Sequence, residues 1–453
     1  MNNSWTAREV ALEVLTKVDK EKSYSNLQLN KTIENSNLSR NDINFATELI
    51  YGTIQHLNTI DWILEQYLNK NAKLEPWVKN LLRLSIYQIW YLDRVPNHAV
   101  VNEAVNIAKA NGHKGISGLV NGILRNLIRN KDSLVIPDNM TESERIALEH
   151  SHPEWLVKRY INDFGLKETV EICRTNNLPP FHSIRVNSLK ITRDEMIIKL
   201  REDLGTEAEI EPSPLSEQGI RIKGGGNLAL SDWYKNGYIS IQDESSMLVA
   251  QVLEPKPNMT ILDGLAAPGG KTTHIAELMM NKGMVIASDI HKHKIKLINQ
   301  QQERLGISII KTLQDDVRNI NKHYGQIFDQ VLLDVPCSGL GVIRRKPDLK
   351  WVKNESDIEN LTKVQMEILE SVSALLKSRG VLVYSTCTMT KEENQQMISN
   401  FLNGHPEFRL DNSLPKYLPN AVNEKIDASM GMIQILPQHF HTDGFFIARL
   451  SKK

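Results

Sequence analysis

The C-terminal half of the chain alternates short apolar runs with amphipathic helical segments from about Gly237 onward. Parallel neighbouring strands need a long crossover, usually a helix, so this alternation is typical of a mainly parallel sheet with helices on its faces. The predicted strands are Thr260–Asp263, Met284–Asp289, Ile309–Leu313, Asp329–Asp334, Val381–Tyr384 and a final antiparallel strand, Gly444–Leu450. We therefore expect a doubly wound α/β domain over residues 237–453.

Three further segments precede this domain, and the apolar spacing differs between them. Residues 1–135 carry apolar side chains at helical spacing and are predicted to form an all-helical domain. Residues 136–178 remain helical but are poorer in apolar positions, which indicates a helical linker. After Pro179-Pro180, residues 179–236 mix short strands with one helix and are predicted to form a small α+β insert.

The charge balance does not indicate a polyanionic partner, because Lys+Arg and Asp+Glu each total 54. Any polyanion-binding site must therefore come from a local patch. One basic stretch, His113–Lys131, contains no acid, and a solvated helix face and a binding surface are equally compatible with it. The apolar runs are too short for a membrane helix, and three scattered cysteines do not make a disulfide framework. We expect a cytoplasmic monomer with no membrane partner.

The most specific local pattern is Ile261-Leu-Asp-Gly-Leu-Ala-Ala-Pro-Gly-Gly-Lys-Thr-Thr-His274. A strand ends in an acid, turns through small residues and enters a helix, so a ligand can approach the backbone and the free N–H groups of the helix. The spacing of a phosphate-binding P-loop fails by one residue, because five positions separate Gly264 from Gly270. The dinucleotide fingerprint also fits poorly. The segment predicts a nucleotide-like ligand of another kind.

Acidic residues stand at the ends of four successive predicted strands. They are Asp263, Asp289, Asp316 and Asp334. A single strand-end Asp is more often a turn or helix cap, but four together are expected to line the crevice where such sheets bind ligands. An acidic rim suits a cationic, adenosine-containing cofactor better than a triphosphate. This pattern favours S-adenosylmethionine.

Two thiols lie on turns that follow neighbouring strands. They belong to Leu333-Asp-Val-Pro-Cys-Ser-Gly-Leu-Gly341 and to Val383-Tyr-Ser-Thr-Cys-Thr-Met389. A lone cysteine is more often a small buried apolar residue than a nucleophile, and Cys173 is interpreted in this way. Cys337 and Cys387 are instead expected to face the cofactor crevice together. Neither has the spacing of a zinc site, so no metal is expected.

A strongly basic segment lies between the two thiols, Arg344-Arg-Lys-Pro-Asp-Leu-Lys-Trp-Val-Lys353. Its five cations, one acid and one indole suit phosphates and stacked bases, although an ordinary exposed loop is the alternative. The predicted RNA-binding residues are Arg344, Arg345, Lys346, Lys350 and Trp351.

With these motifs the sequence resembles the RNA cytosine-5 methyltransferase family. The motifs that carry the resemblance are Ala266-Ala-Pro-Gly-Gly-Lys271, Asp334-Val-Pro-Cys-Ser-Gly, Ser385-Thr-Cys-Thr, Gln242-Asp-Glu-Ser-Ser246 and Arg185-Val-Asn187. The helical N-terminus resembles the NusB-like RNA-binding domain. The combination is similar to the bacterial 16S ribosomal RNA cytosine-5 methyltransferases of the RsmB group. One departure is Gly264-Leu265, where relatives often carry Leu-Cys, and we expect it to alter packing rather than binding.

The resemblance implies an all-α NusB-like domain, a small α+β insert and a Rossmann-like S-adenosylmethionine-dependent methyltransferase domain. It implies that these residues bind or border the cofactor: Leu265, Ala266, Ala267, Pro268, Gly269, Gly270, Lys271, Asp289, Asp316 and Asp334. Cys387 would be the nucleophile that forms a covalent bond to cytosine, and Cys337 would assist product release. Asp334 would hold the amino edge of the base, and Lys271 would lower the pKa of a thiol.

The implied reaction is methylation of carbon 5 of a specific cytosine in 16S ribosomal RNA, either naked or in a small-subunit precursor. Two other functions remain open at this point. A non-catalytic RNA-binding assembly factor would use the helical domain alone, although intact motifs argue against decay. A DNA cytosine methyltransferase would place its nucleophile in the Pro-Cys turn and leave Cys387 without a role. Whether the helical domain contacts RNA or a protein is also open.

Overall fold

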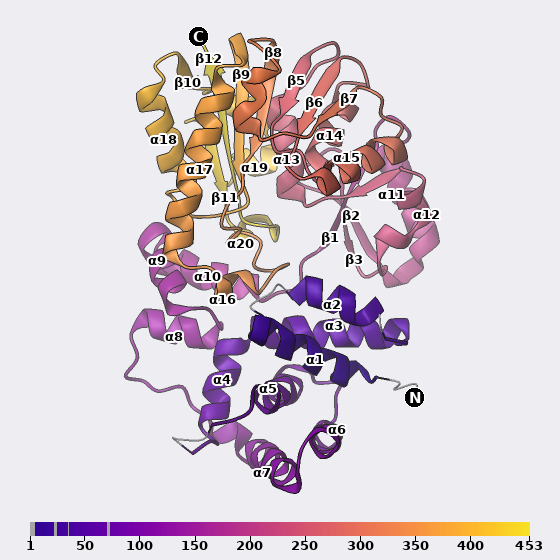
Figure 1. The fold of residues 1–453 in the computed structure, drawn as a ribbon, viewed down its shortest axis with the longest axis vertical. Helices are drawn as coiled ribbons and strands as arrows, with labels where there is room; N and C mark the ends of the chain where they lie inside the picture. Colours follow the sequence, from indigo (N-terminus) through magenta and orange to yellow (C-terminus); the bar gives the residue numbers. More distant parts are fainter. Residues whose placement is uncertain (1–4, 22–24, 35, 70–72) are drawn as a thin grey trace. The chain divides into compact units, whose positions relative to one another are not determined.

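The computed structural model describes residues 5–21, 25–34, 36–69 and 73–453, and the chain divides into two units. The first unit contains the chain up to Asn177 together with Lys346–Val352. The second unit contains Leu178–Arg345 and Lys353–Lys453. Figure 1 draws the first unit mostly in indigo and purple, and the second from magenta to yellow.

The described residues of the first unit form helices and their connecting loops, with no strand. Its helices are α1 (Ala7–Glu21), α2 (Ser25–Glu34), α3 (Arg40–Gln55), α4 (Leu57–Glu65), α5 (Pro76–Tyr91), α6 (Asn97–Asn111), α7 (Lys114–Asn130), α8 (Glu142–Glu149), α9 (Glu154–Phe164), α10 (Leu166–Asn176) and the short α16 (Leu349–Val352). Helix α5 is buried nearly all round from Val78 to Ile89, as is typical of a central helix. It packs against α1, α3, α4, α6 and α7.

The second unit begins with a small antiparallel sheet of four described strands in the order β2-β3-β1-β4. The elements are β1 (His182–Val186), α11 (Arg193–Leu204), β2 (Glu209–Pro212), β3 (Gly219–Lys223), α12 (Asp232–Lys235) and β4 (Ile239–Ile241). One face of this sheet is apolar: Ile184, Ile220 and Ile222 pack against Met196 and Leu200 of α11. The mixture of strands and one long helix is the α+β insert expected from the sequence.

The larger sheet has eight strands within the described chain, ordered β10-β12-β9-β8-β5-β6-β7 with β11 paired to β12. Its strands are β5 (Thr260–Asp263), β6 (Met284–Ser288), β7 (Ile310–Leu313), β8 (Phe328–Asp334), β9 (Leu376–Thr386), β10 (Phe408–Leu410), β11 (Met432–Ile435) and β12 (Phe445–Lys452). Strands β5 to β9 are parallel to their neighbours in that group, and β10 and β11 pair antiparallel to β12, which itself runs antiparallel to β9. The predicted antiparallel final strand is confirmed.

Helices cover both faces of the larger sheet (Figure 1). The helices are α13 (Glu244–Leu253), α14 (Gly270–Leu278), α15 (Lys292–Leu305), α17 (Glu355–Ser373), α18 (Gln395–Gly404), and the short α19 (Asn420–Asn423) and α20 (Pro437–Phe440). Side chains alternate between the faces: Ile261 and Leu332 join the core of α13–α15, whereas Leu262 joins that of α17 and α18.

The strand order reverses at β5, which pairs with β6 on one side and β8 on the other. In open α/β sheets, the carboxyl ends of the strands at such a reversal form the ligand crevice. A ligand site is therefore expected among the residues that follow β5, β8 and β9. Within residues 5–21, 25–34, 36–69 and 73–453, no helix combines the length and the apolar character that crossing a bilayer requires.

Candidate active site

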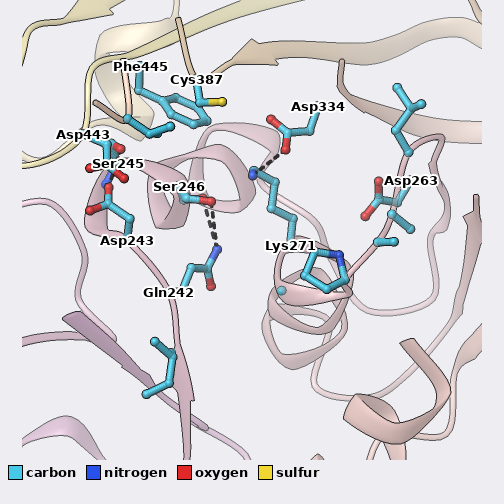
Figure 2. Close-up of a pocket in the computed structure, with 17 residues that line it drawn as sticks. Gln242, Asp243, Ser245, Ser246, Asp263, Lys271, Asp334, Cys387, Asp443 and Phe445 are labelled. Carbon is cyan, nitrogen blue, oxygen red and sulfur yellow. Dashed lines mark hydrogen bonds and ion pairs between the residues drawn. The ribbon is translucent and has the colours of Figure 1, made fainter. Parts of the chain in front are cut away.

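A cavity of about 280 Å³ lies at the carboxyl ends of β5 and β8 (Figure 2). Its wall lies within the second unit and is formed by the segment from β4 into α13, by the loop between β5 and α14, and by residues at or beyond the ends of β8, β9 and α20. The lining residues are Ile241, Gln242, Asp243, Ser245, Ser246, Asp263, Leu265, Ala266, Ala267, Pro268, Gly270, Lys271, Asp334, Val342, Cys387, Asp443 and Phe445. The predicted cofactor loop and one predicted catalytic thiol therefore share one cavity.

The loop between β5 and α14 approaches the cavity with its backbone. Gly269 caps α14 with a φ of 107°, a left-handed conformation that side chains rarely adopt. A Cβ at this position would also come within 3.3 Å of the Ile298 Cα atom. The guanidinium of Arg185, buried in the small sheet, donates to the Gly270 carbonyl oxygen at 2.8 Å and pairs with Glu277. The insert thus braces the first turn of α14.

Asp263 gives the cavity an acceptor oxygen with no hydrogen-bond partner in the part of the chain that the structure describes. Its Oδ2 accepts a hydrogen bond from Thr272 at 2.7 Å, whereas its buried Oδ1 has no partner among the described residues. Buried polar atoms are normally satisfied, so this atom points to a ligand that donates hydrogen bonds. An acidic cavity with a glycine-rich floor fits a cationic adenosine-containing cofactor. Leu265–Lys271, Asp263 and Asp334 would hold it.

Two other predicted cofactor residues, Asp289 and Asp316, do not line this cavity. Asp289 accepts a hydrogen bond from the backbone N–H of His291 at 2.9 Å. Asp316 caps the turn before Val317–Lys322 and pairs with Arg318 at 2.6 Å. Both carboxylates thus make the local turn or helix-cap contacts that are the more common role of an Asp at a strand end. Their contribution to cofactor binding stays a prediction.

We expect the cofactor selectivity of this cavity to depend on pH. Burial raises the pKa of Asp263 to about 6, with hydrogen bonding to Thr272 opposing and the charge of Asp334 adding to the shift. Above that pH the group is an anion, so affinity for cationic S-adenosylmethionine, relative to neutral-sulfur S-adenosylhomocysteine, should rise severalfold between pH 5 and 7. Calorimetric titration measures both affinities, and Asp263→Asn should remove the trend. A flat ratio in the unaltered protein would refute the prediction.

The two predicted thiols meet at this site. Cys337 follows β8, Cys387 follows β9, and their sulfur atoms are 3.3 Å apart. A backbone hydrogen bond of 3.0 Å from Gly341 to the Cys387 carbonyl oxygen joins the two turns. The hydrogen bond to Cys387, followed by burial, raises the pKa of Cys337 well above its usual range. Cys337 therefore keeps its proton, and Cys387 is the thiol of the pair that lines the cavity.

An ion pair lies beside the thiols. The Lys271 ammonium donates to Asp334 Oδ2 at 2.7 Å, as Figure 2 shows, and Ser385 donates to Asp334 Oδ1 at 2.7 Å. Burial lowers the pKa of Lys271, but Asp334, Cys387 and Asp263 more than offset this, so the net pKa is raised. Lys271 is charged at neutral pH and interacts electrostatically with Cys387. In the described ranges, no group of three or more His, Cys, Asp or Glu is arranged to hold a metal.

Glu393 is a site residue that the sequence analysis missed. Its carboxylate is fully buried and accepts from the Ser338 backbone N–H at 2.8 Å and from the Ser338 hydroxyl at 2.6 Å. It also accepts from Thr390 and Gln365, while the Ser338 hydroxyl lies 2.7 Å from that of Thr388. One carboxylate thus fixes the turns that carry Cys337 and Cys387. In the sequence, Glu393 is an isolated Glu after a Thr-rich turn, and nothing in that pattern indicates its contact with Ser338.

We expect Glu393→Gln to reduce turnover without weakening cofactor binding. The amide replaces one acceptor by a donor, so two of the four donors lose their partner, at about 1–3 kcal/mol of stability for each group left unsatisfied. Misplaced sulfur atoms should lower kcat, whereas the cavity that binds the cofactor is unchanged. Steady-state kinetics and calorimetry measure the two effects. Glu359→Gln, on an exposed position of α17, is the matched control. Equal kcat in both variants would contradict this role.

Another missed pair, Asp243 and Asp443, contacts the basic segment from the cavity wall. Arg345 pairs with Asp243 at 2.8 Å and with Asp443 at 3.0 Å. Burial raises the pKa of Asp443 to about 7, an effect to which Asp243 adds and which Arg345 opposes. Arg344 donates to the backbone oxygens of Leu178 and Pro179. Both guanidinium groups, predicted to bind RNA, thus make hydrogen bonds within the second unit.

The remainder of the predicted RNA-binding set lies in the first unit, where Lys350 is buried, Trp351 is half-buried and Lys346 is exposed. The ammonium of Lys350 is fully buried and donates to the backbone oxygens of Gln55 at 2.8 Å and Ser151 at 2.6 Å. Burial lowers its pKa to about 7. The Trp351 indole donates to the Ile54 carbonyl oxygen at 2.7 Å. Of the five predicted residues only Lys346 is exposed. Arg344 and Lys350 thus donate to backbone oxygens, and RNA contact by the five residues stays a prediction.

Comparison with known protein families gives three matches along the chain. The model for 16S rRNA methyltransferase RsmB/F matches residues 250–451. The NusB family model matches residues 6–129, and the model for the ferredoxin-like domain of RsmF/B-like methyltransferases matches residues 152–229. The predicted fold class, a NusB-like helical domain, an α+β insert and an α/β methyltransferase domain, is confirmed.

Individual relatives match over nearly the whole chain. "Probable ribosomal RNA small subunit methyltransferase B" of Bacillus subtilis is 44% identical over 450 residues, which cover 99% of each chain. The Photorhabdus laumondii ribosomal RNA small subunit methyltransferase B is 34% identical over 455 residues, with 100% of each chain covered. The structure of NSun6 from Pyrococcus horikoshii with SFG aligns with a TM-score of 0.58 at 26% identity, covering 66% of this chain and 98% of NSun6.

Proposed function

The chain belongs to the family of 16S rRNA methyltransferases RsmB/F, whose cofactor is S-adenosylmethionine, and we propose that it methylates carbon 5 of a cytosine in 16S ribosomal RNA through a covalent Cys387–cytosine intermediate. One observation carries the proposal. Two thiols from neighbouring strand ends lie 3.3 Å apart, beside a charged Lys271–Asp334 pair, and Cys387 opens into the cofactor cavity. When bound, S-adenosylmethionine supplies an activated methyl group.

Cys387 supplies the nucleophile that this reaction requires. Carbon 5 of cytosine is too weak a nucleophile to accept a methyl group unaided. Addition of a thiolate to carbon 6 moves electron density to carbon 5 and makes it reactive, which is covalent catalysis by an activated cysteine. The Lys271 ammonium interacts with Cys387 strongly enough for this thiol to contribute to the raised pKa of Lys271, so a positive charge lies beside the nucleophile.

Asp334 is the residue placed to hold the base. Its carboxylate is fixed by hydrogen bonds from Lys271 and Ser385 and lines the cavity. In the proposed complex it accepts a hydrogen bond from the exocyclic amino group of cytosine. A carboxylate that accepts from this group selects cytosine over uracil, whose oxygen at the same position cannot donate.

Cys337 completes the cycle by moving protons. After methylation, carbon 5 still carries a hydrogen that must leave before the Cys387–carbon 6 bond can break. In the proposed step, the proton of Cys337 passes to the sulfur of Cys387 as that sulfur departs, and Cys337 accepts the carbon 5 proton. The carbon–hydrogen electron pair forms the ring double bond. The raised pKa of Cys337 keeps this proton in place until it is needed.

The cavity also limits the form of the substrate. At about 280 Å³, and reached from the strand ends, it cannot admit a base that is stacked and paired inside a helix. The target cytosine is therefore in a single-stranded segment or is flipped out of its stack. The position of Cys387 in the cavity lining favours this chemistry over the DNA cytosine enzymes, whose nucleophile lies in the Pro-Cys turn.

A methyl-transfer assay tests the proposal. Purified protein is incubated with radiolabelled S-adenosylmethionine and either 16S ribosomal RNA transcribed in vitro or DNA of the same sequence. We expect label in the RNA alone, recovered as 5-methylcytosine after digestion to nucleosides. Label in DNA only, in another RNA nucleoside, or in neither nucleic acid would overturn the proposal.

A further inference from the structure

The two thiols of the active site are placed to react with each other as well as with a substrate. Their sulfur atoms lie 3.3 Å apart, although the two residues are 50 positions apart in the sequence. In a disulfide the sulfur atoms are about 2.05 Å apart, so bond formation requires them to approach by roughly 1.2 Å. A small rotation of the Cys337 and Cys387 side chains supplies such a movement.

The backbone around the two sulfur atoms holds them in this arrangement. The residues that directly follow the thiols are joined, because the Ser338 hydroxyl lies 2.7 Å from that of Thr388. The Gly341 N–H donates to the Cys387 carbonyl oxygen at 3.0 Å. The strands that precede the two turns, β8 and β9, are paired neighbours in the sheet. The fold therefore keeps the two sulfur atoms within reach of each other.

A small solute can reach the two active-site thiols but not the third cysteine of the chain. Cys337 and Cys387 are partly exposed, and Cys387 lines the catalytic cavity (Figure 2). Cys173 is fully buried in α10. An accessible thiol with a second thiol beside it is the arrangement of redox-sensing sites, where the second thiol captures the oxidised form of the first.

We propose that Cys337 and Cys387 form a reversible disulfide when the enzyme meets a hydroperoxide, and that this disulfide switches methyl transfer off. The juxtaposition of the two sulfur atoms carries the inference. The loss of activity rests on the proposed function, because a disulfide-bonded Cys387 has no sulfur free to add to cytosine. The disulfide also protects the Cys387 sulfur, since it stops oxidation before the irreversible sulfinic acid is formed.

The oxidation takes place in two steps, and Cys387 reacts first because it is the thiol that lines the cavity. Its sulfur attacks one oxygen of the hydroperoxide: a sulfur–oxygen bond forms, the oxygen–oxygen bond breaks, and the thiol proton leaves with the other oxygen as water or an alcohol. The Cys337 sulfur then attacks the resulting sulfenic acid. The sulfur–sulfur bond forms, the sulfur–oxygen bond breaks, and the hydroxide leaves as water with the Cys337 proton. The peroxide thus takes two electrons from the thiol pair, and a cellular dithiol returns them by thiol–disulfide exchange.

The first test looks for the disulfide in the full-length protein, without RNA or cofactor. Reduced protein is treated with hydrogen peroxide, its remaining thiols are alkylated, and its peptides are analysed by mass spectrometry. We expect the peptides of Cys337 and Cys387 to be joined and lighter by the hydrogen of each thiol, and Cys173 to be alkylated. Dithiothreitol should separate the joined peptides. Unjoined peptides, or a joined peptide that contains Cys173, would overturn the proposal.

The second test removes the thiol that captures the sulfenic acid. In Cys337→Ala, excess hydrogen peroxide should convert Cys387 to the sulfinic acid, which dithiothreitol does not reduce. The same treatment of the unaltered protein should leave a Cys387 peptide that dithiothreitol returns to its original mass. Equal recovery of unmodified Cys387 from both proteins would show that Cys337 does not capture the oxidised sulfur, and would overturn the proposal.

The third test follows methyl transfer to RNA by the oxidised protein. The rate should fall in proportion to the fraction of joined peptide and return after dithiothreitol. Cys173→Ala, which keeps both active-site thiols, should lose and regain activity in the same way. A disulfide-bonded protein that still methylates RNA would overturn the switch by removing Cys387 from catalysis, and with it the proposed function. Failure of the disulfide to form would overturn the switch alone, because the first test involves neither RNA nor cofactor.

Discussion

Replacing Cys387 by alanine is expected to abolish methyl transfer while leaving the fold and cofactor binding in place. The Cys387 sulfur lines the cavity and is the atom that attacks carbon 6, so without it carbon 5 is not activated. Removing a covalent nucleophile commonly lowers kcat by a factor of about 10⁴ or more. Single-turnover assays with labelled cofactor measure this loss, and calorimetry with S-adenosylmethionine checks that the cavity persists.

Cys173→Ala is the matched control for this change. Cys173 is buried in α10, and burial raises its pKa to about 12, so it has no reactive thiolate. Its loss should reduce the stability of the first unit modestly and leave the rate per folded molecule intact. Turnover by Cys387→Ala within about tenfold of the original rate would show that another group activates the base.

Replacing Cys337 by alanine is expected to trap the enzyme on its RNA. Of the two thiols, methylation needs only Cys387. Breakdown of the intermediate also needs the proton of Cys337, whose sulfur lies 3.3 Å from the Cys387 sulfur. The variant should therefore form an RNA–protein adduct that survives denaturing electrophoresis, and its turnover should stop near one methyl group per molecule. The unaltered protein should show little of this species.

The double variant Cys337→Ala, Cys387→Ala is the control, because it lacks the sulfur to which the adduct would be attached. It should show no shifted band. The reverse pattern, an adduct in Cys387→Ala and none in Cys337→Ala, would exchange the roles of the two thiols and place the nucleophile in the Pro-Cys turn.

The sequence was most informative where one local pattern determines the structure. The strand at Thr260–Asp263 and the loop that follows were predictable, because an apolar run, small turn residues and a helix start are all local signals. The short strands Phe408–Leu410 and Met432–Ile435 were missed. They are held by pairing with β12, which no pattern within three or four residues can reveal.

The site shows the same distinction. Cys337 and Cys387 were placed together because the carboxyl ends of neighbouring parallel strands meet at one edge. Glu393 and Asp443 act through contacts with distant turns, so their type and spacing carried no information. The burial of Arg344 and Lys350 in the basic segment was missed for a related reason. Charge in a sequence does not reveal whether a cation faces solvent or, like Lys350, donates to buried backbone oxygens.

The central claim is that the Cys387 sulfur binds a cytosine of 16S ribosomal RNA. Mass spectrometry of the trapped Cys337→Ala complex tests it directly. After digestion with nuclease and protease, we predict that the peptide spanning Cys387 carries the mass of one methylated cytidine nucleotide, attached at the sulfur. A modified peptide that lacks Cys387, or a Cys387 peptide of unmodified mass in an enzyme that methylates RNA, would contradict the account.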